Sequence, residues 1–490
     1  MLTLAAVFSD HMVLQRQMPV RVFGEADGPV RVALAGLEAE AMPDESGRFC
    51  ACLPAMAAGG PYELRVSRGD ERRVFHDVMV GEVVLCGGQS NMEFRLRDDA
   101  NGPAEVAAGE DALLRFYTVN EEAVVDAAML ARERETAWKP LAPNTCGDVS
   151  AVAYYAGRRL RAALGVPVGM LICCIGGTEI SSWISREALA GTPDGPEMLA
   201  AFDAAVAGVT DGQFTREEAA YNARVKAWCD IADAMKAAKP GVPISEIVAK
   251  AGDFPWPPPM GPFMLRRPGG PWDTMVRRIT PYGAMGLLWY QGESDSGKAR
   301  HYDARLEKLI DEWRIAFENP DMKVVVAQLP NYDSDPASED WPAIRRAQQA
   351  VCDRVSGCAL SCLIDCGDSK DLHPWKKATP GARMADALLW LACGVGTGAQ
   401  SPRLVKAEAA ADGLLLSFTR PLAPLRDGLS SLLADGEAVN AVLTPDGALK
   451  VLAPGAKKLT YAWENDPKPC LFDSDGLPVL PFEVEIRERQ

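Results

Sequence analysis

Residues 83–93 read Val-Val-Leu-Cys-Gly-Gly-Gln-Ser-Asn-Met-Glu, an apolar run that ends in two glycines and a serine. An unbroken apolar run of this kind is typical of a strand that is buried on both faces of a parallel sheet. Four later segments have the same character: 167–175, 286–290, 323–329 and 359–365. Amphipathic helical stretches lie between and after them, at 153–164, 302–317 and 382–391. This alternation predicts an α/β domain with a mostly parallel sheet.

Segments of other character flank and interrupt the α/β block. Residues 19–84 and the chain after Gly394 alternate apolar and polar positions in short runs broken by Gly, Asp and Pro, a pattern typical of β domains. We therefore expect an N-terminal β domain, an α/β domain in two parts separated by an insertion, and a C-terminal β domain. The predicted boundaries in chain order are 1–80, 81–190, 191–274, 275–395 and 396–490.

The insertion contains a predicted helix and a stretch rich in proline and aromatic residues. A Thr-x-x-Glu capping box predicts that the helix begins at Thr215, and apolar positions recur at helical spacing from Tyr221 to Met235. Residues 254–272 must be extended or looped, because proline cannot donate to a ladder. Their aromatic side chains could stack on sugar rings, although aromatics beside prolines more often cover a core.

Composition and charge limit the classes of function. The 490-residue chain has a net charge of -16, so polyphosphates are repelled and nucleic acid is not an expected partner. The longest apolar runs are about half of the roughly 18 residues that span a bilayer, so no membrane helix is predicted. The first residues lack the pattern of a secretory signal, which predicts a cytoplasmic protein, or a periplasmic or secreted one if a leader was removed.

Ser90 is the first candidate for chemistry. It lies where the first buried strand meets a helix, and ligands of open α/β sheets bind beside the carboxyl ends of the strands. A serine there exposes its hydroxyl beside free backbone N–H groups, as a nucleophile requires. The alternative is that Ser90 only caps the helix, because Ser90 and Glu93 also form a capping box.

Two further strand ends carry polar groups. Gly176 and Gly177 form a turn whose N–H groups could face an oxyanion, although Gly-Gly after a strand is most often only a turn. After the next strand, Gln291 could supply another amide donor and Glu293 a carboxylate. The alternative there is a solvated loop beside a half-buried aromatic residue, Trp289.

Asp371 and His373 are the most informative pair in the chain. Of the four histidines, His373 lies in a loop after an α/β strand with a carboxylate two residues before it. In an extended loop the two side chains project to the same side, and a serine nucleophile needs a base whose tautomer a carboxylate fixes. The alternative is a surface pair ahead of a proline that starts a helix.

Other polar and thiol groups are weaker candidates. The spacing of Cys358, Cys362 and Cys366 suggests metal ligands, but in a strand they share one face with apolar residues, and we interpret them as buried packing side chains. Neither a metal nor an organic cofactor is predicted. Arg345 and Gln348, one turn apart on a helix, either line a pocket or are solvated.

Five segments form a recognisable combination: 8–16 (Phe-Ser-Asp-His-Met-Val-Leu-Gln-Arg), 88–93 (Gly-Gln-Ser-Asn-Met-Glu), 289–294 (Trp-Tyr-Gln-Gly-Glu-Ser), 371–374 (Asp-Leu-His-Pro) and 461–463 (Tyr-Ala-Trp). In this order, and over nearly the whole chain, they resemble the sialate O-acetylesterase family of SGNH hydrolases. The resemblance implies a flavodoxin-like SGNH core, a three-layer αβα domain, flanked by β domains. It also implies metal-free hydrolysis of O-acetyl esters on sugars.

The resemblance gives each candidate a role. Ser90 is the nucleophile, His373 is the base, and the N–H groups of Ser90 and Gly177 form the oxyanion hole, with Gln291 where many SGNH enzymes use an asparagine. The superfamily often has an aspartate three residues before the histidine, but a lysine stands there, so Asp371 is the expected orienting carboxylate. The alternative carboxylates are Glu293 and Asp368, and the candidates for substrate contact are Asn91 and Trp289.

The resulting hypothesis is a serine esterase that removes O-acetyl groups from a sugar or oligosaccharide, with acetylated sialic acid as the first expected substrate. Acetylated hemicellulose (xylan, xyloglucan or mannan) is the alternative substrate, and the acidic net charge weakly favours it. Alternatives of other classes are a carbohydrate-binding protein without turnover and a serine peptidase. The oligomeric state is left open by the sequence.

Overall fold

The computed structural model describes the chain except for residues 240, 397–399, 411–412, 426–428 and 487–490. Its central sheet has the strand order β10-β9-β11-β8-β12-β13-β14, and neighbouring strands are parallel except at the antiparallel edge strand β10. The bounds are β8 (Glu71–Gly88), β9 (Asp111–Thr118), β10 (Lys139–Leu141), β11 (Val168–Cys174), β12 (Gly286–Tyr290), β13 (Lys323–Gln328) and β14 (Cys358–Cys362). The mostly parallel α/β sheet is therefore confirmed.

Strand β9 was not among the predicted apolar runs. It carries Arg115 in its middle, which breaks the apolar pattern. The arginine is nevertheless buried, and its guanidinium donates to the carbonyl oxygens of His11 and Asp77 at 2.8 and 2.5 Å. Because a buried donor with partners is tolerated, a charged residue can occupy a central position of a sheet.

Helices in two packed pairs accompany the central sheet. α4 packs against α12, and α10 packs against α11. Their bounds are α4 (Ala151–Leu164), α10 (Tyr302–Ala316), α11 (Trp341–Arg354) and α12 (Ala378–Cys393), and shorter helices are α2 (Gly102–Ala108), α3 (Ala127–Glu133) and α9 (Arg277–Ile279). α4 begins where the Ser150 side chain accepts from Ala153 N at 3.0 Å and ends at Gly165 in the left-handed conformation.

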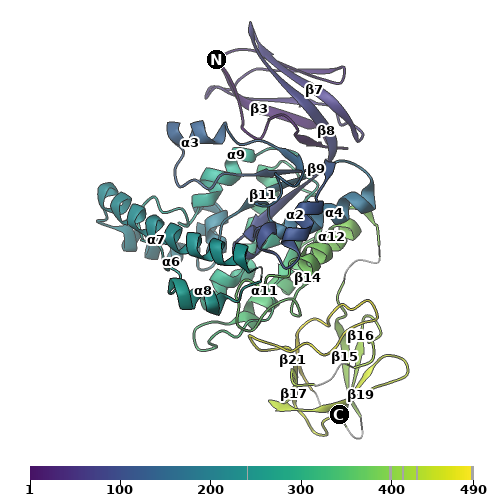
Figure 1. Cartoon of the computed structure of the whole chain (residues 1–490). Coiled ribbons are helices and arrows are strands. Elements are labelled where there is room, and N and C mark those ends of the chain that lie inside the picture. The colour runs from purple at the N-terminus through teal and green to yellow at the C-terminus, as the bar shows by residue number, and fades with distance from the viewer. Residues whose placement is uncertain (240, 397–399, 411–412, 426–428, 487–490) are drawn as a thin grey trace.

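The N-terminal strands join the central sheet through β8. The first part of β8 pairs with β2 and β7, and its last part pairs with β11 and β12, so the predicted boundary at residue 80 falls inside one continuous strand. Figure 1 shows these strands at the end of the molecule that carries the N-terminus. The bounds are β1 (Leu2–Leu4), β2 (Val13–Gln15), β3 (Val20–Ala26), β4 (Val30–Leu34), β5 (Leu37–Ala41), β6 (Arg48–Leu53) and β7 (Gly59–Arg68).

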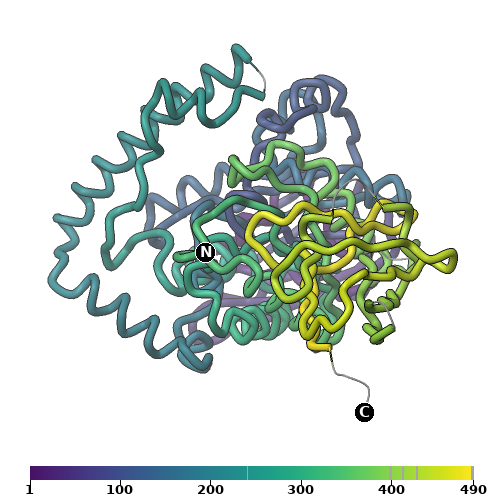
Figure 2. Tube along the Cα trace, turned by 90° about the horizontal axis from the view of Figure 1, so that it is seen from below, coloured from purple at the N-terminus to yellow at the C-terminus, as the bar shows by residue number. Residues whose placement is uncertain are grey.

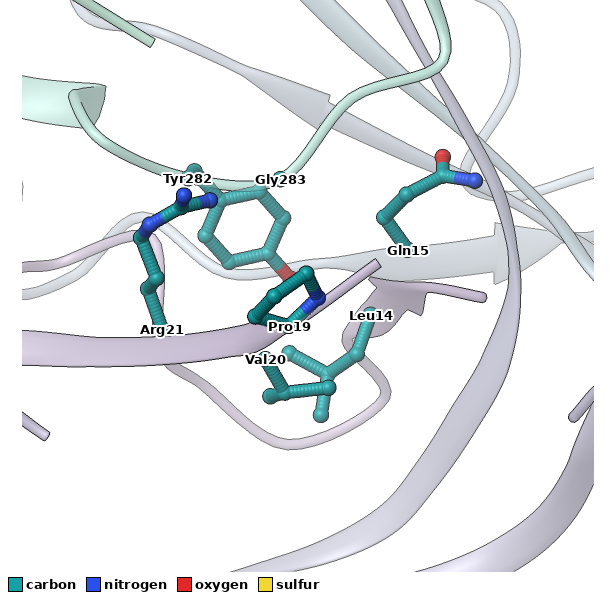
Figure 3. Close-up of a pocket in the computed structure, with 7 residues that line it drawn as sticks. All are labelled: Leu14, Gln15, Pro19, Val20, Arg21, Tyr282 and Gly283. Atoms are coloured by element: carbon teal, nitrogen blue, oxygen red, sulfur yellow. The ribbon is translucent and has the colours of Figure 1, made fainter. Parts of the chain in front are cut away.

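A small pocket lies where the N-terminal strands meet the core. Figure 3 shows Tyr282 and Gly283 on one side of it, with Pro19 and Arg21 near the tyrosine ring. The Tyr282 hydroxyl donates to the carbonyl oxygen of Val13 at 2.7 Å, which ties the segment before β12 to β2. None of the candidate site residues lines this pocket, so we interpret it as a packing seam.

The insertion forms helices that stand to one side of the central sheet (Figures 1 and 2). Their bounds are α6 (Gly195–Val206), α7 (Asp211–Ala238) and α8 (Ile244–Ala251), and the short helix α5 (Arg186–Ala190) directly precedes the insertion. The predicted start at Thr215 is wrong, because α7 begins a turn earlier, where the Thr210 side chain accepts from Gln213 N at 3.2 Å. On the predicted apolar face, Tyr221 and Ala232 are buried, whereas Val225, Trp228 and Met235 are half-buried.

The C-terminal strands form two four-stranded sheets, ordered β15-β16-β20-β19 and β18-β17-β21-β22. Arg345 of α11 ties this region to the core: its buried guanidinium donates to the carbonyl oxygens of Glu464 and Asn465 at 2.6 and 2.8 Å. Arg345 is therefore neither solvated nor pocket-lining. The bounds are β15 (Leu404–Ala410), β16 (Gly413–Phe418), β17 (Leu432–Ala434), β18 (Glu437–Ala438), β19 (Asn440–Leu443), β20 (Leu449–Leu452), β21 (Lys458–Tyr461) and β22 (Phe482–Glu485).

The described residues contain neither a membrane-spanning helix nor a cluster of metal-ligating side chains. None of the helices there combines the length and the apolar character that crossing a bilayer requires. No group of three or more His, Cys, Asp or Glu side chains is arranged to hold a metal ion in the same part of the chain. Cys358 and Cys362 lie on β14, and burial raises the pKa of their thiols to about 11 and about 12.

Candidate active site

Four strand ends bring the candidate residues to one edge of the central sheet. These are the ends of β8, β11, β12 and β14, which are followed by Ser90, Gly177, Gln291 and His373. Gly88 allows the first and third of these ends to approach closely. Its φ is +140°, and a Cβ atom at this position would lie 2.0 Å from the carbonyl oxygen of Tyr290. Only glycine fits at this position, so Gly88 has a steric reason.

Ser90 and His373 form a hydrogen bond across this edge. Ser90 Oγ lies 2.8 Å from His373 Nε2, although the two residues are far apart in the sequence. Ser90 begins the short helix α1 (Ser90–Glu93), whose N-cap is Gln89, and the Glu93 carboxylate accepts from Gly176 N at 2.5 Å. The capping-box alternative for Ser90 is therefore not what the structure has.

The surroundings of His373 keep its imidazole neutral. Burial and the positive charges of Lys377 and Lys236 lower the pKa of His373 to about 4. A neutral imidazole can accept a proton from Ser90 at neutral pH. Because Nε2 faces the serine, accepting that proton requires the ring hydrogen to be on Nδ1.

The predicted carboxylates do not orient this ring. Asp371 Oδ1 accepts from the backbone N–H of His373 at 2.8 Å, Asp368 Oδ1 accepts from a backbone N–H of the same loop, and Glu293 Oε1 accepts from Asn91 Nδ2 at 2.7 Å. Within the described part of the chain, none of the three carboxylates hydrogen-bonds the imidazole. The geometry thus corrects the expected role of Asp371, because its carboxylate stabilises the loop and not the ring.

Two predicted N–H donors remain available beside the nucleophile. A Cβ atom on Gly176 would lie 3.3 Å from Ser90 Cβ, so the turn of Gly176 and Gly177 packs directly on the serine. Glu93 takes the N–H of Gly176, whereas the N–H groups of Ser90 and Gly177 have no hydrogen-bond partner among the described residues. Gly177 has a φ of +69°, a conformation that favours glycine.

Gln291 is not brought into the oxyanion position. Its side chain is fully buried, and Nε2 lies 3.2 Å from Gln89 Oε1, 3.1 Å from the carbonyl oxygen of Thr178 and 2.7 Å from Asp295 Oδ2. Its Oε1 accepts from the hydroxyl of Tyr302 at 2.9 Å. Both amide hydrogens thus have acceptors within the protein, and Gln291 ties the end of β12 to the turn that follows β11.

The two candidates for substrate contact are both buried. Trp289 packs in the core between Trp183 and Trp313, with ring centroids 6.1 and 6.0 Å away. A fully buried indole cannot contact a sugar at the strand ends. Asn91 lies behind the nucleophile, where its Nδ2 donates to the carbonyl oxygen of Leu372 at 3.1 Å.

Residues 232–389 match the sequence model of a family described as carbohydrate esterase, sialic acid-specific acetylesterase. The resemblance to the sialate O-acetylesterase family is confirmed. The matched segment includes His373, and Ser90 lies before it. The sialate O-acetylesterases of Rattus norvegicus and Homo sapiens are 27% and 25% identical over 339 and 337 residues. Each alignment covers 64% of this chain and 56% or 53% of the relative, so the chain spans about half the length of the curated relatives it matches.

A solved structure is similar over the whole chain. A carbohydrate acetylesterase from Xanthomonas citri covers 99% of this chain and is itself covered to 99%, with a TM-score of 0.74 and 24% sequence identity. This likeness shows a shared fold, a mixed α/β architecture with β regions at both ends.

Lys377 is a site residue that neither the motifs nor the family resemblance indicated. It is fully buried, and its Nζ lies 2.5 Å from Asn91 Oδ1 and 4.9 Å from the ring centroid of Phe94. Burial lowers the pKa of Lys377 to about 7, although Glu293 opposes that shift. In the sequence it is indistinguishable from the exposed Lys376 beside it.

The Glu93 carboxyl and two residues of the insertion surround the turn at 176–177. Burial raises the pKa of Glu93. Arg266 Nε donates to the carbonyl oxygen of the turn at 2.6 Å, and the guanidinium carbon lies 5.8 Å from the ring centroid of Trp256. Trp256 is 54% exposed, so part of the aromatic stretch borders the candidate site and does not only cover a core.

Proposed function

We propose that this protein is a serine esterase that removes O-acetyl groups from carbohydrate, as a sialate O-acetylesterase does. The observation that carries the proposal is the 2.8 Å hydrogen bond between Ser90 Oγ and His373 Nε2 at the carboxyl ends of parallel strands. The proposal includes an SGNH-type three-layer αβα core with the predicted domain division, and the two helix pairs α4–α12 and α10–α11 support it.

Acylation begins when Ser90 Oγ attacks the acetyl carbonyl and its proton passes to His373 Nε2. The carbonyl oxygen becomes an oxyanion, which accepts hydrogen bonds from the N–H groups of Ser90 and Gly177. Collapse of this intermediate breaks the ester bond, and the departing sugar oxygen takes the proton from the imidazolium. The acetyl group is then bonded to Ser90 and the deacetylated sugar leaves.

Deacylation repeats these steps with water. His373 Nε2 takes a proton from the water as its oxygen attacks the acetyl-serine carbonyl, and the same N–H groups hold the second oxyanion. When the bond to Ser90 Oγ breaks, the imidazolium returns its proton to that oxygen. Acetate leaves and the enzyme is restored.

The proposed mechanism uses a pair, Ser90 and His373, without a carboxylate on the ring. With a pKa of about 4, His373 is a weak base, because burial and the charge of Lys377 both disfavour the imidazolium. The negative charge that develops on the oxyanion offsets the new positive charge on the ring. The N–H donors are therefore as important to the proposal as the base.

The substrate is proposed from chemistry and from the names of the relatives. An O-acetylated sialic acid is the first candidate, because the curated relatives are named sialate O-acetylesterase. The net charge of -16 favours a neutral acetylated hemicellulose as the second candidate, since an anionic sugar is repelled by an acidic protein. A cytoplasmic location stays a prediction from the sequence.

The proposal is tested with Ser90→Ala and Ser338→Ala, which changes an exposed serine. We expect Ser90→Ala to lower kcat for release of acetate from p-nitrophenyl acetate by about 10⁴-fold or more. Ser338→Ala should retain full activity. Undiminished turnover by Ser90→Ala would contradict the proposed nucleophile. A panel of acetylated sialic acids and acetylated xylo-oligosaccharides, scored by acetate release from the unaltered protein, then separates the two substrate classes.

A further inference from the structure

Lys377 is a buried cation that the proposed mechanism does not use. Its side chain is 0% exposed, and its Nζ donates to Asn91 Oδ1 at 2.5 Å. The ammonium also lies 4.9 Å from the ring centroid of Phe94 and 5.8 Å from that of Tyr290. A buried charge carries a desolvation penalty, so its retention beside the nucleophile calls for a role.

Asn91 connects this cation to the rest of the site. Its Nδ2 donates to Glu293 Oε1 at 2.7 Å and to the carbonyl oxygen of Leu372 at 3.1 Å, while its Oδ1 accepts from Lys377. The two ends of an asparagine amide are nearly the same size, so packing alone does not fix which end points where. The lysine ammonium can only donate and a carbonyl can only accept, so protonated Lys377 and the Leu372 carbonyl together select one orientation.

The same amide joins the two chain segments that carry the catalytic pair. Asn91 directly follows Ser90, and Leu372 directly precedes His373. The hydrogen bond between Asn91 Nδ2 and the Leu372 carbonyl therefore links the backbone of the nucleophile to the backbone of the base. The Asp371 carboxylate accepts a hydrogen bond from the His373 backbone N–H within the loop, whereas the Asn91 side chain links that loop to α1.

We propose that Lys377 is a positioning residue for the esterase reaction, which orients the Asn91 amide and through it holds His373 Nε2 against Ser90 Oγ. This inference rests on the proposed function. Lys377 acts through Asn91 and not as a base, because its Nζ hydrogen-bonds Asn91 while Ser90 Oγ hydrogen-bonds His373. The lysine and asparagine secure the loop that carries His373, whereas no carboxylate among the described residues hydrogen-bonds the His373 ring.

Charges around Lys377 support its retention as a cation. The groups that favour its protonated form are the carboxylates of Glu293, Asp371 and Asp99. Glu293 is buried on the other side of the Asn91 amide, so Lys377 and Glu293 lie at the two ends of a single side chain. The Lys377 backbone N–H donates to Asp99 Oδ2 at 2.7 Å, which fixes the start of α12.

The test compares Lys377→Met, Asn91→Ala and the double variant, with Lys376→Met as the matched control on the adjacent exposed lysine. Misplacing a reacting group by about 1 Å can cost on the order of 100-fold in rate. We therefore expect Lys377→Met to lower kcat on p-nitrophenyl acetate by roughly 10- to 100-fold with KM nearly unchanged. The double variant should be no slower than Asn91→Ala alone, because both changes break one connection. Lys376→Met should match the unaltered protein.

Three results would overturn the inference: full kcat in folded Lys377→Met, full kcat in Asn91→Ala, or losses that multiply in the double variant. Thermal melting checks that each variant is folded, and Asn91→Ala keeps the test decisive if Lys377→Met does not fold. A second readout separates charge from packing: the acid limb of the pH profile should move to higher pH in Lys377→Met, since a positive charge near His373 is lost. If Ser90→Ala remains active, the proposed function itself fails, which is a different outcome.

Discussion

The two sides of Ser90 are built in opposite ways. On the histidine side, Asn91, Lys377 and Glu293 are buried, and each is hydrogen-bonded to a neighbour in the network. On the oxyanion side, the turn at 176–177 lies under Trp256, whose ring is half exposed. One side is a closed polar network and the other is an accessible aromatic surface.

This difference indicates that the two sides of Ser90 have different functions. A buried polar network resists movement, because a group that shifts leaves an unpaired partner at a cost of about 1–3 kcal/mol. An exposed aromatic ring offers an apolar face to a ligand without a strict geometry. We therefore expect changes on the histidine side to act on kcat and changes at the outer part of the oxyanion side to act on KM.

Among changes on the oxyanion side, Gly177→Ala should lower kcat most, because it displaces an N–H donor of the oxyanion hole and not only the aromatic surface. A Cβ at this position would lie 2.5 Å from Trp256 Cη2, and the φ of +69° disfavours any L side chain. The turn must shift, and loss of one oxyanion donor costs on the order of 100-fold or more in kcat. Steady-state kinetics on p-nitrophenyl acetate measure this loss.

Gly165→Ala is the matched control for backbone strain. Gly165 has a φ of +66°, and a Cβ there meets no heavy atom within 4 Å. Its substitution should lower the melting temperature while leaving kcat unchanged. Equal kinetics for the two variants would contradict the assignment of Gly177 to the oxyanion hole.

The pH dependence of kcat/KM tests the histidine side of the site. The neutral form of His373 is the active base, and its pKa is lowered to about 4, so activity is expected to be complete at neutral pH and lost as the pH falls through about 4. Below that point kcat/KM for p-nitrophenyl acetate should fall about tenfold per pH unit. An acid limb near the ordinary histidine value of about 6.5 would indicate a solvated ring or a carboxylate partner.

Acid unfolding would also lower the activity at low pH, so a control for folding is needed in that range. Samples held near pH 4 and returned to neutral pH should regain full activity, and tryptophan fluorescence should show no unfolding at the pH where activity falls. A limb that coincides with the fluorescence transition would assign the loss to unfolding and not to His373.

Long apolar runs made the positions of Ser90 and His373 predictable. Each run defines a strand, parallel strands end at one edge, and residues after those ends must meet. The sequence could not show that Asp371 contacts a backbone N–H, because the two-residue spacing that puts side chains on one side of an extended loop also suits a local turn. The sequence could not show either that the Gln291 amide hydrogen-bonds inside the protein, since its acceptors come from three separate segments.

Lys377 and Thr215 show two other limits of sequence patterns. Lys377, the N-cap of α12, and the adjacent Lys376 differ only in that one side chain is buried and the other exposed, and tertiary packing decides this difference. Thr215 satisfies the capping-box pattern, but Thr210 caps the helix a turn earlier, and Thr215 instead donates to the carbonyl oxygen of Asp211 within α7. The capping-box pattern therefore permits a helix start at Thr215 but does not require it.

Trp256→Ala should give the smallest effect and should separate binding from chemistry. Stacking of a sugar on an aromatic face contributes about 1 kcal/mol, which corresponds to roughly a fivefold change in affinity. KM for an acetylated oligosaccharide should therefore rise by about that factor, while kinetics on p-nitrophenyl acetate, which carries no sugar, should not change. Phe254→Ala is the matched control, because Phe254 belongs to the same stretch but packs on Trp228, with ring centroids 5.2 Å apart. If Trp256→Ala lowered kcat equally on both substrates, the indole would support the turn at 176–177. The oxyanion side would then help to align the reacting groups, as the buried network on the histidine side does.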